Sequence, residues 1–165
     1  MTEKPGFRIQ IPGFGDRDIN TIISDFTGTL SCGGALSPEV REKLVRLTQL
    51  VEIHVLSADT FGTVRQEFAG VPVILQILGG GREHEQKAVY ASRYHPKHVA
   101  ALGNGNNDRL LLSRVKEAGG LAIAVDNGEG CSVETILQAH MLVHGAASAL
   151  DLLLQPLRLL ATLRF

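Results

Sequence analysis

Short apolar segments of β-type residues alternate with helical stretches along most of this chain, and this alternation restricts the folds open to it. The expected strands span Thr21–Ser24, Val51–Leu56, Val71–Leu78, Val99–Leu102, Leu121–Val125 and Met141–Val143. The expected helices span Ser37–Gln49, Thr60–Phe68, Glu83–Arg93, Asp108–Ala118, Val133–Gln138 and Ala146–Leu154. Strands that are apolar throughout are typical of a parallel sheet covered on both faces. The pattern therefore predicts an α/β fold with a Rossmann-like, doubly wound, mainly parallel sheet.

The two ends of the chain extend this pattern. Residues Phe7–Ile11 are expected to add an edge strand, joined through a turn at Gly13–Asp18. The Leu-rich tail Leu150–Phe165 is expected to form an amphipathic helix on the core or at a subunit contact. With 165 residues and no linker-like stretch, we expect a single domain over residues 1–165.

Composition excludes several classes of partner. The formal net charge is -1, which gives no electrostatic footprint for nucleic acid or an anionic membrane. No run approaches the roughly 18 apolar residues of a membrane span, and the first residues lack the apolar core of a signal peptide. Cys32 and Cys131 form no CxxC pair. We therefore expect a cytoplasmic protein in a reducing compartment.

Polar residues follow nearly every expected strand. They are Asp25, Ser57, Asp59, Asp126 and several residues between 104 and 108. In a doubly wound sheet, ligands bind beyond the carboxyl ends of the strands, so these side chains are expected to converge at one rim.

The segment Asp25-Phe26-Thr27-Gly28-Thr29-Leu30 carries the clearest chemical signal. An aspartate at a strand end can present a carboxylate oxygen to phosphorus, and the amides of the following turn can hold phosphate oxygens. The string DFTGTL resembles the DKTGTL phosphorylation motif of P-type ATPases, within the haloacid dehalogenase (HAD) superfamily of aspartyl-phosphate enzymes.

Three further segments resemble the remaining motifs of that superfamily, in the same order. Residues 55–59 (VLSAD) are similar to the second motif, Lys87 occupies the place of the third-motif lysine, and residues 103–108 (GNGNND) are similar to GDGxND. The resemblance spans about Thr21 to Val143.

The resemblance implies a role for each matched residue. Asp25 would be the nucleophile, Ser57 would hydrogen-bond a phosphoryl oxygen, and Lys87 would neutralise charge between them. A magnesium ion would be held by Asp25, the Thr27 carbonyl, Asn104 and Asp108. The substrate phosphate would contact Thr27, Gly28, Ser57, Ala58 and Lys87. Carboxylate and amide oxygens suit magnesium.

Two positions depart from the superfamily pattern. Thr27 stands where phosphatases of this superfamily usually carry a second, acid/base aspartate, and assistance of that kind contributes roughly 10²–10⁴-fold to a rate. Asn104 stands where a charged magnesium ligand is expected. We therefore predict a magnesium-dependent phosphatase or phosphotransferase with slow turnover, a preference for acyl or aryl phosphates, and weakened magnesium affinity.

The chain has no room for the nucleotide-binding insertion of the ATPases or for a large cap, and only a short flap is expected over residues 29–36. An open site suits a large phosphorylated substrate or one completed by a second subunit, which makes a homo-oligomer reasonable.

Two alternatives to an active phosphatase are considered. The first is a catalytically weak or inactive regulatory phosphate-binding protein, marked by Thr27 and Asn104. A receiver-type signalling domain is disfavoured, since receivers place the acceptor aspartate on their third strand.

Overall fold

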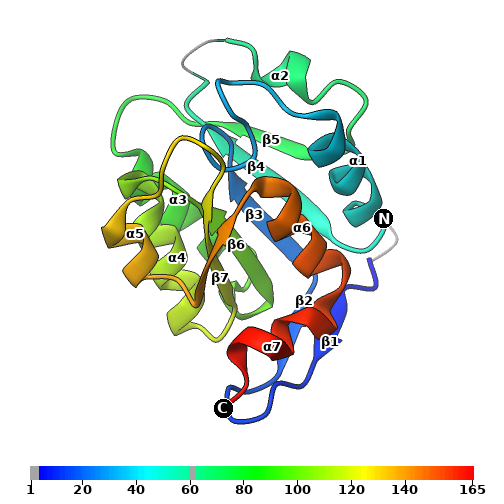
Figure 1. Cartoon of the computed structure of the whole chain (residues 1–165). Coiled ribbons are helices and arrows are strands. Elements are labelled where there is room, and N and C mark those ends of the chain that lie inside the picture. Colours follow the sequence, from blue (N-terminus) through cyan, green and yellow to red (C-terminus); the bar gives the residue numbers. More distant parts are fainter. Residues whose placement is uncertain (1–3, 60–61) are drawn as a thin grey trace.

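A six-stranded parallel sheet forms the centre of the computed structural model, which describes residues 4–59 and 62–165 (Figure 1). Every neighbouring pair of strands is parallel. In spatial order the strands are β5 (Ile74–Ile77), β4 (Glu52–Ser57), β3 (Thr21–Asp25), β6 (Val99–Gly103), β7 (Leu121–Asp126) and β8 (Met141–His144). This arrangement confirms the predicted α/β fold with a mainly parallel sheet.

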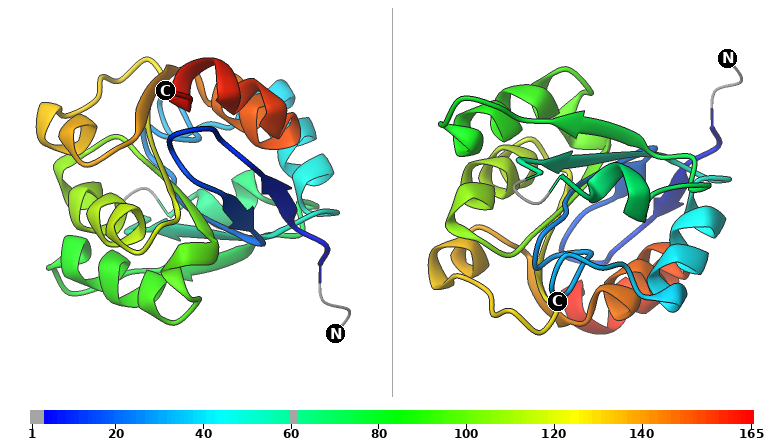
Figure 2. Two further views of the ribbon diagram at one scale, coloured as in Figure 1. Left: turned by 90° about the horizontal axis from the view of Figure 1, so that it is seen from below. Right: turned by 90° about the horizontal axis from the view of Figure 1, so that it is seen from above.

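Helices cover both faces of the sheet, as Figure 2 shows. One layer contains α1 (Pro38–Leu47) and α6 (Ala146–Leu154), which contact each other. The opposite layer contains α3 (Glu83–Ser92), α4 (Arg109–Glu117) and α5 (Val133–Leu137). Successive strand residues therefore enter different cores. Ile22 of β3 packs in the α1/α6 core and Ile23 in the α3/α4 core.

The central position of β3 fixes the place where a ligand can bind. From β3 the chain builds β4 and β5 on one side and then β6, β7 and β8 on the other. Strand order thus reverses between β3 and β6, and the crevice beyond the carboxyl ends of such strands is where doubly wound folds bind ligands. Asp25 is the last residue of β3.

The N-terminal segment does not form the predicted edge strand of the main sheet. Strand β1 (Phe7–Ile9) pairs antiparallel with β2 (Arg17–Ile19) in a separate two-stranded sheet. The amides of Phe14 and Gly15 both donate to the Ile11 carbonyl, which reverses the chain. The outer strands of the main sheet are instead β5 and β8.

The C-terminal tail does not form one continuous helix. Helix α6 ends at Leu154, and after a 3-10 turn at Pro156–Arg158 the chain continues as α7 (Leu159–Leu163), bent by 106°. Pro156 lacks the amide hydrogen that a continuing helix needs. Within residues 4–59 and 62–165, no single helix has both the length and the apolarity to cross a membrane, and only this bent pair meets those criteria jointly.

Two expected elements are much shorter than predicted. Strand β5 covers only Ile74–Ile77, because Pro72 cannot donate a ladder hydrogen bond. The helix predicted over residues 60–68 is α2 (Val64–Glu67), and residues 60–61 of that prediction lie outside the described residues.

Candidate active site

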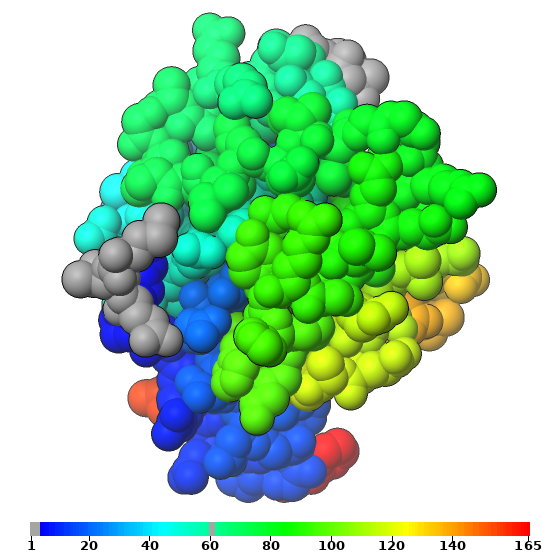
Figure 3. Space-filling model, turned by 180° about the vertical axis from the view of Figure 1, so that it is seen from behind, coloured from blue at the N-terminus to red at the C-terminus, as the bar shows by residue number. Residues whose placement is uncertain are grey.

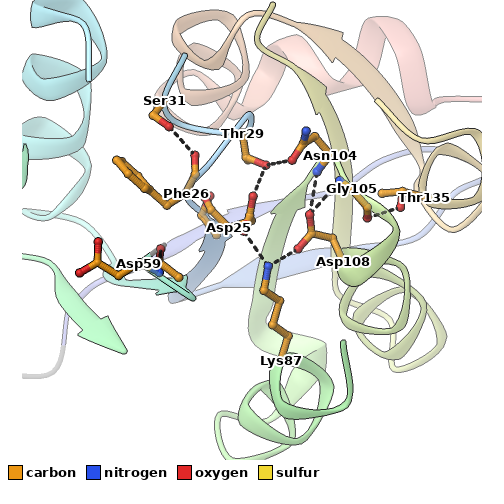
Figure 4. A network of polar contacts seen from close by, with 12 residues as sticks. Asp25, Phe26, Thr29, Ser31, Asp59, Lys87, Asn104, Gly105, Asp108 and Thr135 are labelled. Carbon is orange, nitrogen blue, oxygen red and sulfur yellow. Dashed lines mark hydrogen bonds and ion pairs between the residues drawn. The ribbon is translucent and has the colours of Figure 1, made fainter. Parts of the chain in front are cut away.

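Asp25 lies at the centre of a polar network at the carboxyl rim of the sheet (Figure 4). Its side chain is buried, and the residue is only 6% exposed. Asp25 Oδ1 accepts a hydrogen bond from Lys87 Nζ at 2.6 Å, and Oδ2 accepts one from Thr29 Oγ1 at 3.0 Å. Both oxygens of the predicted nucleophile are therefore held in fixed directions.

Lys87 joins two carboxylates that are distant in the sequence. It extends from α3 beneath the rim and is 1% exposed. Its Nζ donates to Asp25 Oδ1 at 2.6 Å and to Asp108 Oδ1 at 2.7 Å. The predicted convergence of these three motifs is therefore present in the structure as direct contacts.

Asp108 organises the loop that follows β6. Its Oδ2 accepts from the amides of Asn104 at 2.9 Å and Gly105 at 3.0 Å. A Cβ atom at Gly103 would lie 2.4 Å from the Asp108 Cβ, so only glycine fits there. With Oδ1 bound to Lys87 and Oδ2 to two amides, Asp108 has a supporting geometry. Its predicted place among the metal ligands stays a prediction.

The electrostatics of this network follow from burial. Burial raises the pKa of Asp25 to about 6, and the nearby Asp108 adds to the rise, although Lys87 and Thr29 oppose it. For Lys87, burial lowers the pKa, but the charges and hydrogen bonds of Asp108 and Asp25 outweigh it and raise the pKa above its usual value. Two acids and one base leave the triad one negative charge in excess when all three groups are ionised.

Thr29 is a site residue that the sequence prediction missed. Its Oγ1 lies 3.0 Å from Asp25 Oδ2 and 3.0 Å from Asn104 Oδ1, and it is fully buried. The available signal was a second hydroxyl residue four positions after Asp25, on the same turn. Asn104 Nδ2 donates to the Gly130 carbonyl at 3.3 Å, which directs Oδ1 toward Thr29.

The turn after β3 requires glycine at position 28. Gly28 has a φ of +78°, and a Cβ atom there would lie 2.5 Å from Asn104 Nδ2. Thr27 beside it is exposed. The tight Cys32–Ala35 turn follows, closed by reciprocal backbone hydrogen bonds.

Ser57 reaches the same rim from the neighbouring strand. Leu56 pairs with Asp25 in the register of β3 and β4, so Ser57 lies one residue beyond that pair. Ser57 Oγ accepts from the Asp59 amide at 2.9 Å, which leaves its hydroxyl proton free to donate. Ala58 is exposed next to it. Their contacts with a phosphate stay predictions.

The donors at the rim fit a hard divalent cation. Asp25 Oδ2, Thr29 Oγ1 and Asn104 Oδ1 form a chain of oxygens, and only the Thr29 hydroxyl supplies a proton. One of these two contacts therefore has two oxygens facing each other without a hydrogen, an arrangement that a bound cation relieves. No group of three His, Cys, Asp or Glu side chains gathers in the described ranges, so this site depends on mixed oxygen donors.

Comparison with known structures identifies the class of fold. The cobalt-bound deoxy-D-mannose-octulosonate 8-phosphate phosphatase of Haemophilus influenzae superposes with a TM-score of 0.63 at 16% identity, covering 83% of this chain and 88% of that one. The Moraxella catarrhalis 3-deoxy-D-manno-octulosonate 8-phosphate phosphatase, solved with magnesium and phosphate, superposes with a TM-score of 0.62 at 14% identity, covering 87% of this chain and 90% of that one. A HAD-superfamily protein of subfamily III A from Legionella pneumophila superposes with a TM-score of 0.63 at 14% identity, covering 87% of this chain and 86% of that one. The chain thus has the fold of HAD-superfamily phosphatases.

Sequence comparison adds a nearer relationship. The chain belongs to the same family as an uncharacterized protein of Methanocaldococcus jannaschii, with 46% identity over 68 residues that cover 41% of this chain and 69% of the relative. No protein-family model matches the chain.

Proposed function

We propose that this protein is a magnesium-dependent phosphatase or phosphotransferase that forms an aspartyl phosphate on Asp25. The observation that carries the proposal is the placement of Lys87, which contacts Asp25 at 2.6 Å and Asp108 at 2.7 Å in a buried site. A long cationic side chain held between two carboxylates at a strand-end rim is suited to a phosphoryl group. Phosphatases of the same fold, one solved with magnesium and phosphate, support this function.

The residues divide the chemistry among themselves. Asp25 Oδ1 attacks phosphorus, the bond from phosphorus to the leaving oxygen breaks, and that oxygen departs with the bonding electron pair. Lys87 neutralises the carboxylate before attack and the phosphoryl oxygens during it. The Ser57 hydroxyl and the Ala58 amide hydrogen-bond the remaining oxygens, whereas the Gly28 amide, expected from the sequence to join them, already donates to the Ser31 carbonyl at 3.1 Å. Hydrolysis of the aspartyl phosphate by water then regenerates Asp25.

The cation side of the site uses the other carboxylate oxygen. Asp25 Oδ2, Asn104 Oδ1 and the Thr27 carbonyl would hold magnesium, and Asp108 would support the loop behind it. When bound, magnesium supplies positive charge to the phosphoryl oxygens and lowers the repulsion between substrate and carboxylates.

Thr27 limits the rate in this mechanism. Its hydroxyl cannot exchange a proton near neutral pH, so the leaving oxygen departs unprotonated and the attacking water is not activated. Acyl and aryl phosphates, which leave readily as anions, are therefore the expected substrates. Thr27→Asp should raise phosphatase turnover, and an unchanged or lower rate in a folded variant would contradict this explanation.

The direct test uses acetyl phosphate and para-nitrophenyl phosphate with magnesium. Wild-type protein should hydrolyse them or accumulate a trapped acyl phosphate, whereas Asp25→Asn should do neither. Activity that survives this substitution would remove Asp25 from the mechanism.

A second candidate is a regulatory phosphate-binding protein. The replacements at Thr27 and Asn104 favour it, because both remove groups that turnover needs. In that case wild-type protein would bind inorganic phosphate with magnesium, measured by calorimetry, without hydrolysing either substrate.

A further inference from the structure

A second buried polar network lies beneath α3, next to the proposed site. His54 of β4 has no exposed surface. Its Nδ1 is 2.8 Å from the Tyr90 hydroxyl, and its Nε2 is 2.7 Å from Glu52 Oε1. The Tyr94 ring packs against the imidazole with centroids 4.2 Å apart. Figure 3 shows the green segment that contains α3 covering this face of the molecule.

When His54 is neutral, the donor and the acceptor of each hydrogen bond in this network can be assigned in only one way. The Glu52 carboxylate only accepts, so His54 Nε2 carries the proton and donates to it. His54 Nδ1 is then a bare acceptor, and the Tyr90 hydroxyl donates to it. Burial lowers the pKa of His54 despite Glu52, which agrees with a neutral ring. Tyr90 therefore has a single strong partner, and that partner is on β4.

Tyr90 and Lys87 lie on the same face of α3. They are three positions apart on the helix, so their side chains leave it one turn from each other toward the sheet. The N-terminus of α3 has no side-chain cap, and three glycines at residues 79–81 precede Arg82. At that end the Gln86 side chain donates to the Gly79 and Gly81 carbonyls at 2.8 and 2.6 Å, which ties the helix to its own preceding loop rather than to the sheet. The His54–Tyr90 hydrogen bond supplies a fixed point nearer its C-terminal end.

We propose that His54 and Tyr90 are positioning residues that set the location of Lys87. Their hydrogen bond holds α3 against β4, the strand that ends at Ser57, so that Lys87 Nζ reaches Asp25 and Asp108 together. The catalytic consequence rests on the function proposed above, in which Lys87 contacts the transferring phosphoryl group. The effect on the Lys87 ammonium group does not depend on that function.

The test compares two tyrosine variants on the same helix. Tyr90→Phe removes the hydroxyl that donates to His54, whereas Tyr94→Phe removes a hydroxyl that lies 3.4 Å from Tyr90 and bonds no ring nitrogen. Tyr90→Phe should lower kcat by about ten- to hundredfold with little change in KM, because a small misplacement of Lys87 weakens transition-state contacts. Tyr94→Phe should leave kcat within about twofold of wild type.

A spectroscopic readout follows Lys87 itself. In wild type, the proton–nitrogen NMR signal of a buried ammonium bonded to two carboxylates should be resolved. Tyr90→Phe should shift or broaden it, and Tyr94→Phe should preserve it. If Tyr90→Phe lowers stability but leaves the Lys87 signal unchanged, the residue has only a structural role and the proposal is wrong.

A histidine series covers the chance that one variant fails to fold. In His54→Asn the side-chain carbonyl takes the place of Nδ1 and can accept from Tyr90, so it should retain the Lys87 signal that His54→Leu loses. Equal signals in both variants would overturn the proposal. If wild-type protein hydrolyses no phosphate at all, the proposed function fails while the NMR comparison still decides the positioning role.

Discussion

Two buried polar networks share one face of α3, and they differ in charge. The upper network contains Asp25, Lys87 and Asp108, all ionisable and all buried. The lower network contains neutral His54 and Tyr90, and its only carboxylate, on Glu52, is 42% exposed. Every buried side-chain nitrogen and oxygen in the described part of the chain lies within hydrogen-bonding distance of a partner.

The difference in charge separates function from support. Burying ions is costly even when they are paired, whereas a satisfied neutral network in a core specifies one arrangement at little electrostatic cost. Of these two networks, the one with buried charges lies at the rim, where a phosphate and a cation would bind. The other anchors the helix beneath with neutral groups. Removing groups from the two networks should therefore change stability and activity by different amounts, and the changes in stability should differ in sign.

The largest effect is expected from Lys87→Met. This change leaves two buried carboxylates without their cation, which should lower the free energy of unfolding by about 3–5 kcal/mol. Urea unfolding in EDTA at pH 7.5 measures it, with the exposed Lys97→Met as control. Equal stability of the two variants would show that the triad is not electrostatically coupled.

A change of opposite sign in the free energy of unfolding is expected from Asp25→Asn. The folded-state pKa of about 6 exceeds the ordinary value of 3.8, so folding favours the protonated acid. This contribution to stability is complete below pH 3.8 and is lost as pH rises through 6. The variant should therefore be more stable than wild type by about 1–3 kcal/mol at pH 7.5 without metal, and the gain should vanish near pH 4.

Urea unfolding at several pH values tests this gain, and the variant should also lack activity. A loss of stability at pH 7.5 would mean that the ion pair with Lys87 outweighs the burial of Asp25.

A smaller loss is expected from Tyr90→Phe. The bare Nδ1 of His54 would lose its donor, which should cost about 1–2 kcal/mol. Because burial keeps the pKa of His54 low, the cost should be the same at pH 6.5 and pH 8. Chemical unfolding at both values measures it, and a cost that varies with pH in this range would show that His54 titrates there.

The smallest effect is expected from Asn104→Asp, which adds a third carboxylate to the upper network. Ligand charge strengthens cation binding, so magnesium affinity should rise about tenfold, measured by calorimetry. The gain is limited because the new oxygen would face the Gly130 carbonyl in place of the 3.3 Å hydrogen bond. Tight, micromolar binding by wild type would instead show that Asn104 is a sufficient ligand.

The sequence indicated the fold and most of the rim because both depend on local patterns. Apolar strands followed by polar residues predicted the parallel sheet, and Asp25, Lys87 and Asp108 were identified from the motif resemblance. Thr29 was missed although it lies within the first motif, because its hydroxyl matters only through the position of Asn104, which is 75 residues away. The separate β1–β2 hairpin was missed because β2, at Arg17–Ile19, has only three residues and gives little strand pattern in the sequence.

The amino-acid sequence by itself indicated that acidic and hydroxyl residues follow the strands, and hence that these groups would share one rim. Only the tertiary structure decided which oxygen of Asp25 faces Lys87 and that two backbone amides donate to Asp108. It also decided that His54 holds the helix that carries Lys87. Strand exits follow from periodicity along the chain. Hydrogen bonds between side chains on different elements depend on how a helix is placed on a sheet, and that placement is set by packing across the whole core.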